Sequence, residues 1–136
     1  MSRKLIILIE NDANLRQSLT LILQRAGYLV TATDDVCEAL DLLQCVDCQL
    51  LISDINVPAT SQVLLPMILK LHPLLAVLIL SDLSSTETEA ASKQFGAHYL
   101  VKPIAPQHLV DSVRSILGNK KIDNHSKNHA QTVNGF

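Results

Sequence analysis

Polar side chains in this 136-residue chain recur directly after short apolar runs. Asp54 follows the run "LLIS", and Lys102 follows "HYLV". Other members of the pattern are Glu10, Asn11, Asp12, Asp34, Asp35, Ser81 and Asp82. Clustered oxygen ligands suit a hard cation such as Mg²⁺, which takes one or two carboxylates and a phosphate. A lysine among them would neutralise a carboxylate or a bound anion. If the fold brings them together, these residues predict a cation site that can also receive an anion.

Two sequence patterns alternate between these polar residues. Five short apolar runs predict strands, at residues 5–9, 28–33, 49–53, 75–80 and 98–101. Five segments with apolar residues at helical spacing predict helices, at residues 13–26, 36–43, 63–71, 84–95 and 106–117. Strict alternation of this kind predicts an α/β fold with a parallel sheet and helices on both faces.

The carboxyl ends of parallel strands meet at one edge of the sheet, where ligands bind in this class of fold. The polar residues listed above should therefore converge there. Helix capping is the alternative for the acids that directly precede a helix, and we favour it for Asp35. Asp54 is different, because the loop "INVP" follows it rather than a helix.

Glycines mark the expected helix ends and the end of the folded domain. Gly27 stands where the first helix should stop, and Gly118 should close the last one. After Gly118 the composition changes to Asn, Lys, His, Gln and Ser. We therefore predict one domain over residues 1–118 and a polar, flexible tail over residues 119–136.

Composition argues against several classes of function. A net charge of −2 gives no overall attraction to nucleic acid or to an acidic membrane. The most apolar stretch is interrupted by Pro66, Lys70 and Pro73, so no membrane span is expected and a cytoplasmic protein is predicted. The cysteine pair in "CVDC" lies after a helix and before a strand, on the wrong side for a thioredoxin-like motif, so we interpret these thiols as structural or incidental. A flavin protein of the same topology would need a glycine in "ENDANLR", which has none.

Four motifs together resemble the receiver domain of two-component response regulators. They are "LIILIENDANLR", "LLISDINVP", "VLILSD" and "GAHYLVKP", in this order and at the expected strand ends. The resemblance covers Lys4 to about Leu117. It implies the flavodoxin-like receiver fold, doubly wound, with strand order 2-1-3-4-5. It also implies a phosphoacceptor domain in a phosphorelay rather than an enzyme.

The resemblance implies a role for each matching residue. Asp54 matches the aspartate that receives a phosphoryl group from a histidine kinase or phosphotransfer protein. Ser81 and Lys102 match the residues that bind this group, and the Lys102–Pro103 peptide bond is usually cis in the family. Tyr99 matches the aromatic switch residue. Asn56 matches the position whose backbone carbonyl binds Mg²⁺.

The sequence departs from the family pattern at two informative positions. Glu10 and Asn11 occupy the acidic pair, of which the second is normally a metal-binding aspartate. With an amide at Asn11, the site formed by Glu10, Asn11, Asp54 and Asn56 should bind Mg²⁺ weakly. Asp82 places a negative charge where the family usually has a small residue, which opposes an incoming phosphoryl group. A degenerate receiver that acts through protein contacts alone is therefore the alternative.

The length of the chain leaves no room for an effector domain, so we expect a single-domain response regulator. Its signal should leave through a downstream protein that binds the face over residues 85–117, which the family also uses for homodimers. A histidine kinase or phosphotransfer protein is the expected upstream partner.

Overall fold

A computed structural model describes residues 3–54, 65–82 and 96–123, with residues 65 and 119–123 described by their backbone alone. The strands are β1 (Leu5–Ile9), β2 (Leu29–Thr33), β3 (Leu50–Asp54), β4 (Ala76–Ser81) and β5 (His98–Val101). The helices are α1 (Ala13–Arg25), α2 (Val36–Cys45), α3 (Leu65–Leu71) and α5 (Pro106–Asp123). The helix predicted at residues 84–95 lies outside the described residues, as do residues 124–136.

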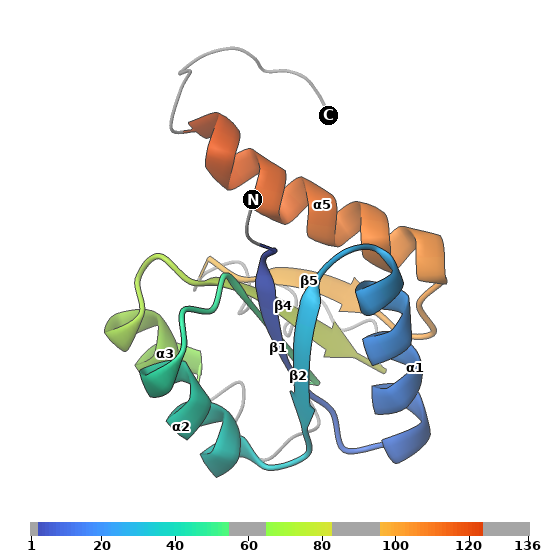
Figure 1. Ribbon diagram of the computed structural model, residues 1–136, viewed down its shortest axis with the longest axis horizontal. Coiled ribbons are helices and arrows are strands. Elements are labelled where there is room, and N and C mark those ends of the chain that lie inside the picture. Colours follow the sequence, from blue (N-terminus) through green and yellow to red (C-terminus); the bar gives the residue numbers. More distant parts are fainter. Residues whose placement is uncertain (1–2, 55–64, 83–95, 124–136) are drawn as a thin grey trace.

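The strands form one parallel sheet in the order β2-β1-β3-β4-β5, which confirms the predicted fold class and topology (Figure 1). The register aligns Leu8 of β1 with Ile52 of β3, and Ile52 with Leu78 of β4. The three inner strands therefore end close together at one edge of the sheet.

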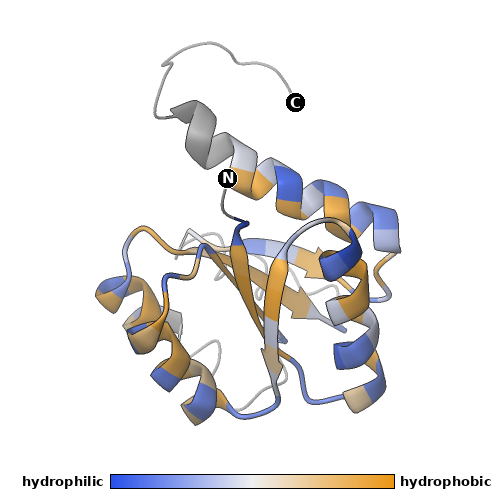
Figure 2. Cartoon of the chain, in the orientation of Figure 1, coloured by the Kyte–Doolittle hydropathy of each residue, from blue (hydrophilic) through white to orange (hydrophobic). Residues whose placement is uncertain are grey.

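Each inner strand carries apolar side chains on both faces of the sheet, as expected for continuous apolar runs. Ile7, Ile9 and Ile79 lie in the core on the side of α2 and α3. Ile6 and Leu8 lie in the opposite core with side chains of α1 and α5. Figure 1 shows these two helix pairs on either side of the sheet, and Figure 2 shows the inner strands coloured almost wholly as hydrophobic. Charge is thus kept out of the strand interiors and appears only where strands end.

The predicted end of α1 is confirmed, and the predicted end of α5 is wrong. Gly27 follows α1 with φ 103°, a left-handed conformation that favours glycine. Gly118 lies inside α5, which continues to Asp123. An interior glycine costs a helix only about 1 kcal/mol relative to alanine. Asn119, Lys120 and Lys121 follow Gly118. None of them is a proline, so the sequence does not force the helix to stop at Gly118.

None of the helices that the structure describes is long and apolar enough to cross a membrane.

Candidate functional site

The carboxyl end of the sheet brings three of the predicted site residues into direct contact. The Nζ atom of Lys102, just after β5, lies 3.0 Å from Oε1 of Glu10, which follows β1. The same Nζ lies 3.2 Å from Oδ2 of Asp54, the last residue of β3. The side chains of Glu10 and Asp54 are only 1% and 4% exposed. A buried carboxylate is costly unless it is paired, and Lys102 is the cation that pairs both.

The backbone around this site is fixed by hydrogen bonds between neighbouring strands. The N–H group of Lys102 donates to the carbonyl of Ser81 at the end of β4, 2.7 Å away, and Ser81 is itself buried. The N–H group of Glu10 donates to the carbonyl of Thr33 at the end of β2. The Lys102–Pro103 peptide bond is cis, as the family resemblance implied.

Arg16 of α1 supports the site in a way that the sequence did not predict. Its Nη1 atom donates to the backbone carbonyl of Glu10 at 2.8 Å. The Oε2 atom of Glu10 accepts from the N–H group of Asp12 at 3.1 Å. The loop that carries Glu10 is therefore held from both sides. Arg16 is six residues after Glu10 in the chain. This closeness in the sequence is the one feature from which the contact could have been suspected.

Two buried carboxylates share one ammonium group, so the three side chains carry a net charge of −1 when all are ionised. Burial raises the pKa of Glu10 above its usual value, an effect that the hydrogen bonds from Asp12 and Lys102 only partly offset. Burial by itself would lower the pKa of Lys102, but its hydrogen bonds and charge interactions with Glu10 and Asp54 outweigh burial and raise the pKa. The raised pKa of Glu10 reflects the cost of burying its charge, and the raised pKa of Lys102 reflects the two carboxylates around it.

Asp82 adds a third carboxylate near the same ammonium group. Its Oδ1 atom lies 3.9 Å from Nζ of Lys102, and its side chain is 59% exposed. This distance is too long for a hydrogen bond, and an ion pair so exposed to water is worth at most about 1 kcal/mol. An anion bound to Lys102 would nevertheless lie close to the carboxylate of Asp82.

Two other acids at this end of the sheet cap helices. Asp12 caps α1, because its Oδ1 accepts from the N–H groups of Asn14 and Leu15. Asp35 caps α2 through the N–H group of Cys37, which confirms the interpretation favoured from the sequence. Asp34 and Asn11 are exposed, and Asn56 lies outside the described residues.

Comparison with known proteins decides the family. The sequence model of the response regulator receiver domain matches residues 6–114. The chain belongs to this family. It is a response regulator receiver domain of two-component signalling, a signalling domain rather than a conventional enzyme.

Relatives and solved structures agree with this assignment. The cell cycle response regulator CtrA of Brucella ovis is 31% identical over 130 residues, which are 94% of this chain and 53% of CtrA. The chain thus spans about half the length of the curated relatives it matches. A CheY-like receiver domain protein of Methanospirillum hungatei is 25% identical with a TM-score of 0.82, covering 90% of this chain and 99% of that one. Chemotaxis protein CheY4 of Vibrio cholerae is 27% identical with a TM-score of 0.77, covering 85% of this chain and 100% of that one.

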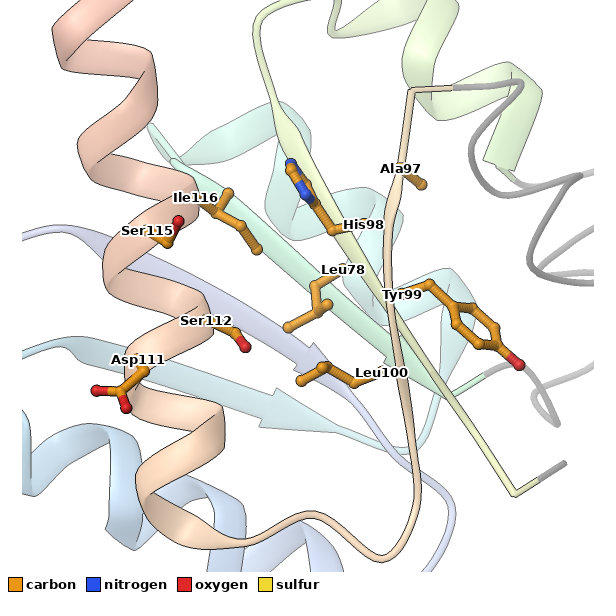
Figure 3. Close-up of a pocket in the computed structure, with 9 residues that line it drawn as sticks. All are labelled: Leu78, Ala97, His98, Tyr99, Leu100, Asp111, Ser112, Ser115 and Ile116. Atoms are coloured by element: carbon orange, nitrogen blue, oxygen red, sulfur yellow. The ribbon is translucent and has the colours of Figure 1, made fainter. Parts of the chain in front are cut away.

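The residue at the receiver family's switch position, Tyr99, lies half-buried in β5. It packs against the core cluster on the α2 and α3 side of the sheet, which includes Ile79. Figure 3 shows its ring pointing away from α5, although Tyr99 also lines, with His98 and Leu100, the cavity of about 470 Å³ between β5 and α5. Burial lowers the pKa of His98. The switch role of Tyr99 stays a prediction.

Receiver domains generally bind Mg²⁺ at the phosphorylation site. Within the described residues, no group of three His, Cys, Asp or Glu side chains is placed to hold a metal ion. Glu10 and Asp54 still fit Mg²⁺, because this ion needs only one or two carboxylates and keeps several waters. The net negative charge of these side chains with Lys102 also favours a cation. A site with so few charged ligands should be weak.

The cysteines form no part of this site. Cys37 and Cys45 are exposed, and the thiol of the partly buried Cys48 donates to the carbonyl of Leu50 at 3.2 Å. This contact fits the structural role that the sequence suggested for Cys48.

Proposed function

We propose that Asp54 is the phosphoacceptor of this receiver domain, acting in the cytoplasm within a two-component pathway. The observation that carries the proposal is the carboxylate of Asp54, buried at the end of β3 and held 3.2 Å from the ammonium group of Lys102. The donor would be a phosphohistidine on a histidine kinase or phosphotransfer protein. The family as a whole exchanges signals with such kinases and with downstream effectors.

The chemistry is the transfer of one phosphoryl group between two side chains. A carboxylate oxygen of Asp54 attacks the phosphorus, an O–P bond forms and the P–N bond to histidine breaks. The electron pair of the broken bond stays on the histidine nitrogen. The contact of Lys102 with Oδ2 of Asp54 orients the carboxylate before attack. Because the phosphoryl group adds about −1.5 to −2 of charge, the same ammonium group can then bind it.

Neighbouring residues would stabilise the product. The hydroxyl of Ser81, at the buried end of β4, is the proposed hydrogen-bond donor to the phosphoryl group, and Tyr99 is the proposed switch. Mg²⁺ would neutralise part of the charge on the phosphoryl group when it binds. Glu10, Asn11, Asp54 and the carbonyl of Asn56 are its proposed ligands, and the amide of Asn11 makes the site weak.

The output of the domain is proposed to be another protein. The proposed contact face covers residues 85–117, of which β5 and the first part of α5 belong to the described residues. We propose that this domain signals through protein contacts, without itself contacting nucleic acid or membrane. A homodimer through this face is the alternative to a separate partner protein, and its formation would not require Leu74.

A degenerate receiver is the second candidate, and the contact between Asp82 and Lys102 favours it. Their 3.9 Å separation gives Lys102 a third carboxylate before any phosphoryl group arrives. Asp82 would also repel the anionic donor. In this case Asp54 and Lys102 would serve only to hold the ends of β3 and β5 together.

Incubation with acetyl phosphate and saturating Mg²⁺, followed by intact mass spectrometry, separates the two candidates. The wild-type protein should gain one phosphoryl group, and Asp54→Ala should gain none. Asp82→Ala should react severalfold faster, because a repulsion of about 1 kcal/mol corresponds to roughly fivefold in rate. A wild-type protein and an Asp82→Ala variant that both stay unmodified would establish the degenerate receiver. Modification of Asp54→Ala would assign the reaction to another carboxylate.

A further inference from the structure

The amino end of the sheet carries an exposed apolar surface. Leu74 is 82% exposed, Leu71 is 59% exposed, and Val46 and Met67 are each 39% exposed. Met67 and Leu71 lie one turn apart on α3 and so share a face, and Leu74 follows in the connection to β4. Figure 2 shows the hydrophobic colour of α3 resuming within this connection. Single exposed leucines are common, but a gathered group marks an interaction site. We call these four side chains the amino-end patch.

A hollow of about 360 Å³ lies beside the protruding leucine. Its apolar lining includes Leu43 and Leu75, both buried, together with Val46, Leu71 and Leu74 of the patch. The exposed carboxylate of Asp47 also borders the hollow, as does His72. The surface therefore offers a site for one apolar side chain accompanied by a cation.

We propose that the amino-end patch is the interface of a symmetric dimer of this chain. The patch carries both halves of the contact. Leu74 lines the hollow and is 82% exposed, so its side chain is accessible to a second copy, and the exposed cation Lys70 precedes it by four residues. In a two-fold dimer, Leu74 of each copy enters the hollow of the other, and Lys70 of each copy faces Asp47 of the other. Any other partner would need an exposed apolar side chain with a cation close to it, and a second copy of this chain already has both.

The position and size of the patch set the character of this dimer. The patch and hollow precede β3 and β4, at the opposite end of the sheet from Glu10, Asp54 and Lys102 (Figure 1). Dimerisation would leave the proposed phosphorylation site accessible, and it does not depend on that proposal. A standard interface buries roughly 800 Å² on each partner. Four aliphatic side chains cover less, so the dissociation constant should be on the order of 100 µM.

Sedimentation velocity over protein concentrations from about 10 µM to about 1 mM tests the proposal. The wild-type protein should pass from monomer to dimer. Leu74→Lys should raise the dissociation constant at least tenfold, because it removes both protruding leucines. Leu21→Lys is the matched control, since Leu21 is a 45% exposed leucine on α1. This control should dimerise like the wild type. A wild type that stays monomeric at 1 mM, or a Leu74→Lys variant that dimerises equally well, would overturn the proposal.

A charge exchange tests the two-fold arrangement itself. Asp47→Lys and Lys70→Asp should each be monomeric alone, because each homodimer would bring two like charges together twice. An equimolar mixture should dimerise, since both contacts then join a lysine to an aspartate. A mixture that associates no better than its components would contradict the two-fold contact. Both changed residues are exposed, and unchanged thermal unfolding midpoints would show that the variants are folded. If the wild type is monomeric and another protein binds the patch, the dimer is excluded.

Discussion

At the carboxyl end of the sheet, Glu10 and Asp54 are buried acids held by one lysine, whereas at the amino end Leu71 and Leu74 are apolar side chains left in water. The first arrangement costs stability through burial of charge, whereas the second leaves hydrophobic surface available for association. The strand interiors between them are uniformly apolar and packed on both faces. The comparison teaches that function in this domain is to be sought at strand ends, with the proposed phosphorylation at one edge and the proposed self-association at the other.

The strongest test of this contrast removes the cation at the carboxyl end. Lys102→Met keeps much of the side-chain volume but leaves two buried carboxylates facing each other. We expect a loss of about 3 kcal/mol in the free energy of unfolding at pH 8, because breaking a buried ion pair leaves uncompensated charge. The loss should shrink at pH 5, where one carboxyl group can take up a proton. Urea unfolding measures this loss of stability. Lys4→Met, which changes an exposed lysine, is the control. Equal stability of the two variants at pH 8 would contradict the account.

The pH dependence of the wild-type protein follows from the raised pKa of Glu10. The folded state holds this proton more tightly than the unfolded state. Stability from Glu10 is therefore fully present below the ordinary value of 4.5 and is lost as the pH rises through the higher folded pKa. With EDTA present, Glu10→Gln should become progressively more stable than the wild type between pH 4.5 and 7. The gain should be smaller than the loss in Lys102→Met. A difference in stability between Glu10→Gln and the wild type that does not change with pH would show that burial does not raise the pKa of Glu10.

Asn11→Asp should restore a charged oxygen beside Glu10 and Asp54. Magnesium affinity should rise about tenfold, because ligand charge sets the affinity of such sites. Titration of Mg²⁺ followed by NMR shifts measures both proteins, and Asn14→Asp on the exposed first turn of α1 serves as a control for added charge. Equal affinities in Asn11→Asp and the wild type would remove Asn11 from the proposed ligand set.

The smallest effect is expected at the amino end. Leu71→Ser should change the free energy of unfolding by no more than about 0.5 kcal/mol, since exposed positions contribute little to stability. Unfolding is measured in dilute protein, where self-association is negligible. A loss comparable to that of Lys102→Met would show that Leu71 belongs to the core rather than to an exposed patch.

The sequence predicted the sheet and the core of the site because each rests on a local pattern. Continuous apolar runs such as Leu5 to Ile9 defined the strands, and the acids after them marked the edge where Asp54 and Lys102 meet. The cap at Asp35 was equally local. The continuation of α5 past Gly118 was missed, since a glycine can end a helix or be tolerated within one at modest cost.

Other features depend on packing that no local pattern specifies. The contact of Arg16 with the carbonyl of Glu10 requires the angle between α1 and β1. The exposure of Leu71 and Leu74 depends on how α3 is rotated against the sheet, because the stretch around them is apolar throughout. Sequence alone therefore identified the carboxyl end of the sheet as a site but gave no indication of the amino end.

The central claim is that Asp54, held by Lys102, is the reactive carboxylate of this receiver domain. Titration with beryllofluoride, a phosphoryl mimic, in saturating Mg²⁺ tests it most directly by NMR. We predict shifts in Glu10, Asp54, Ser81 and Lys102, no shift at Leu71 and Leu74, and no response in Asp54→Ala. A wild-type protein that shows no shifts, or an Asp54→Ala variant with the same shifts, would contradict the claim.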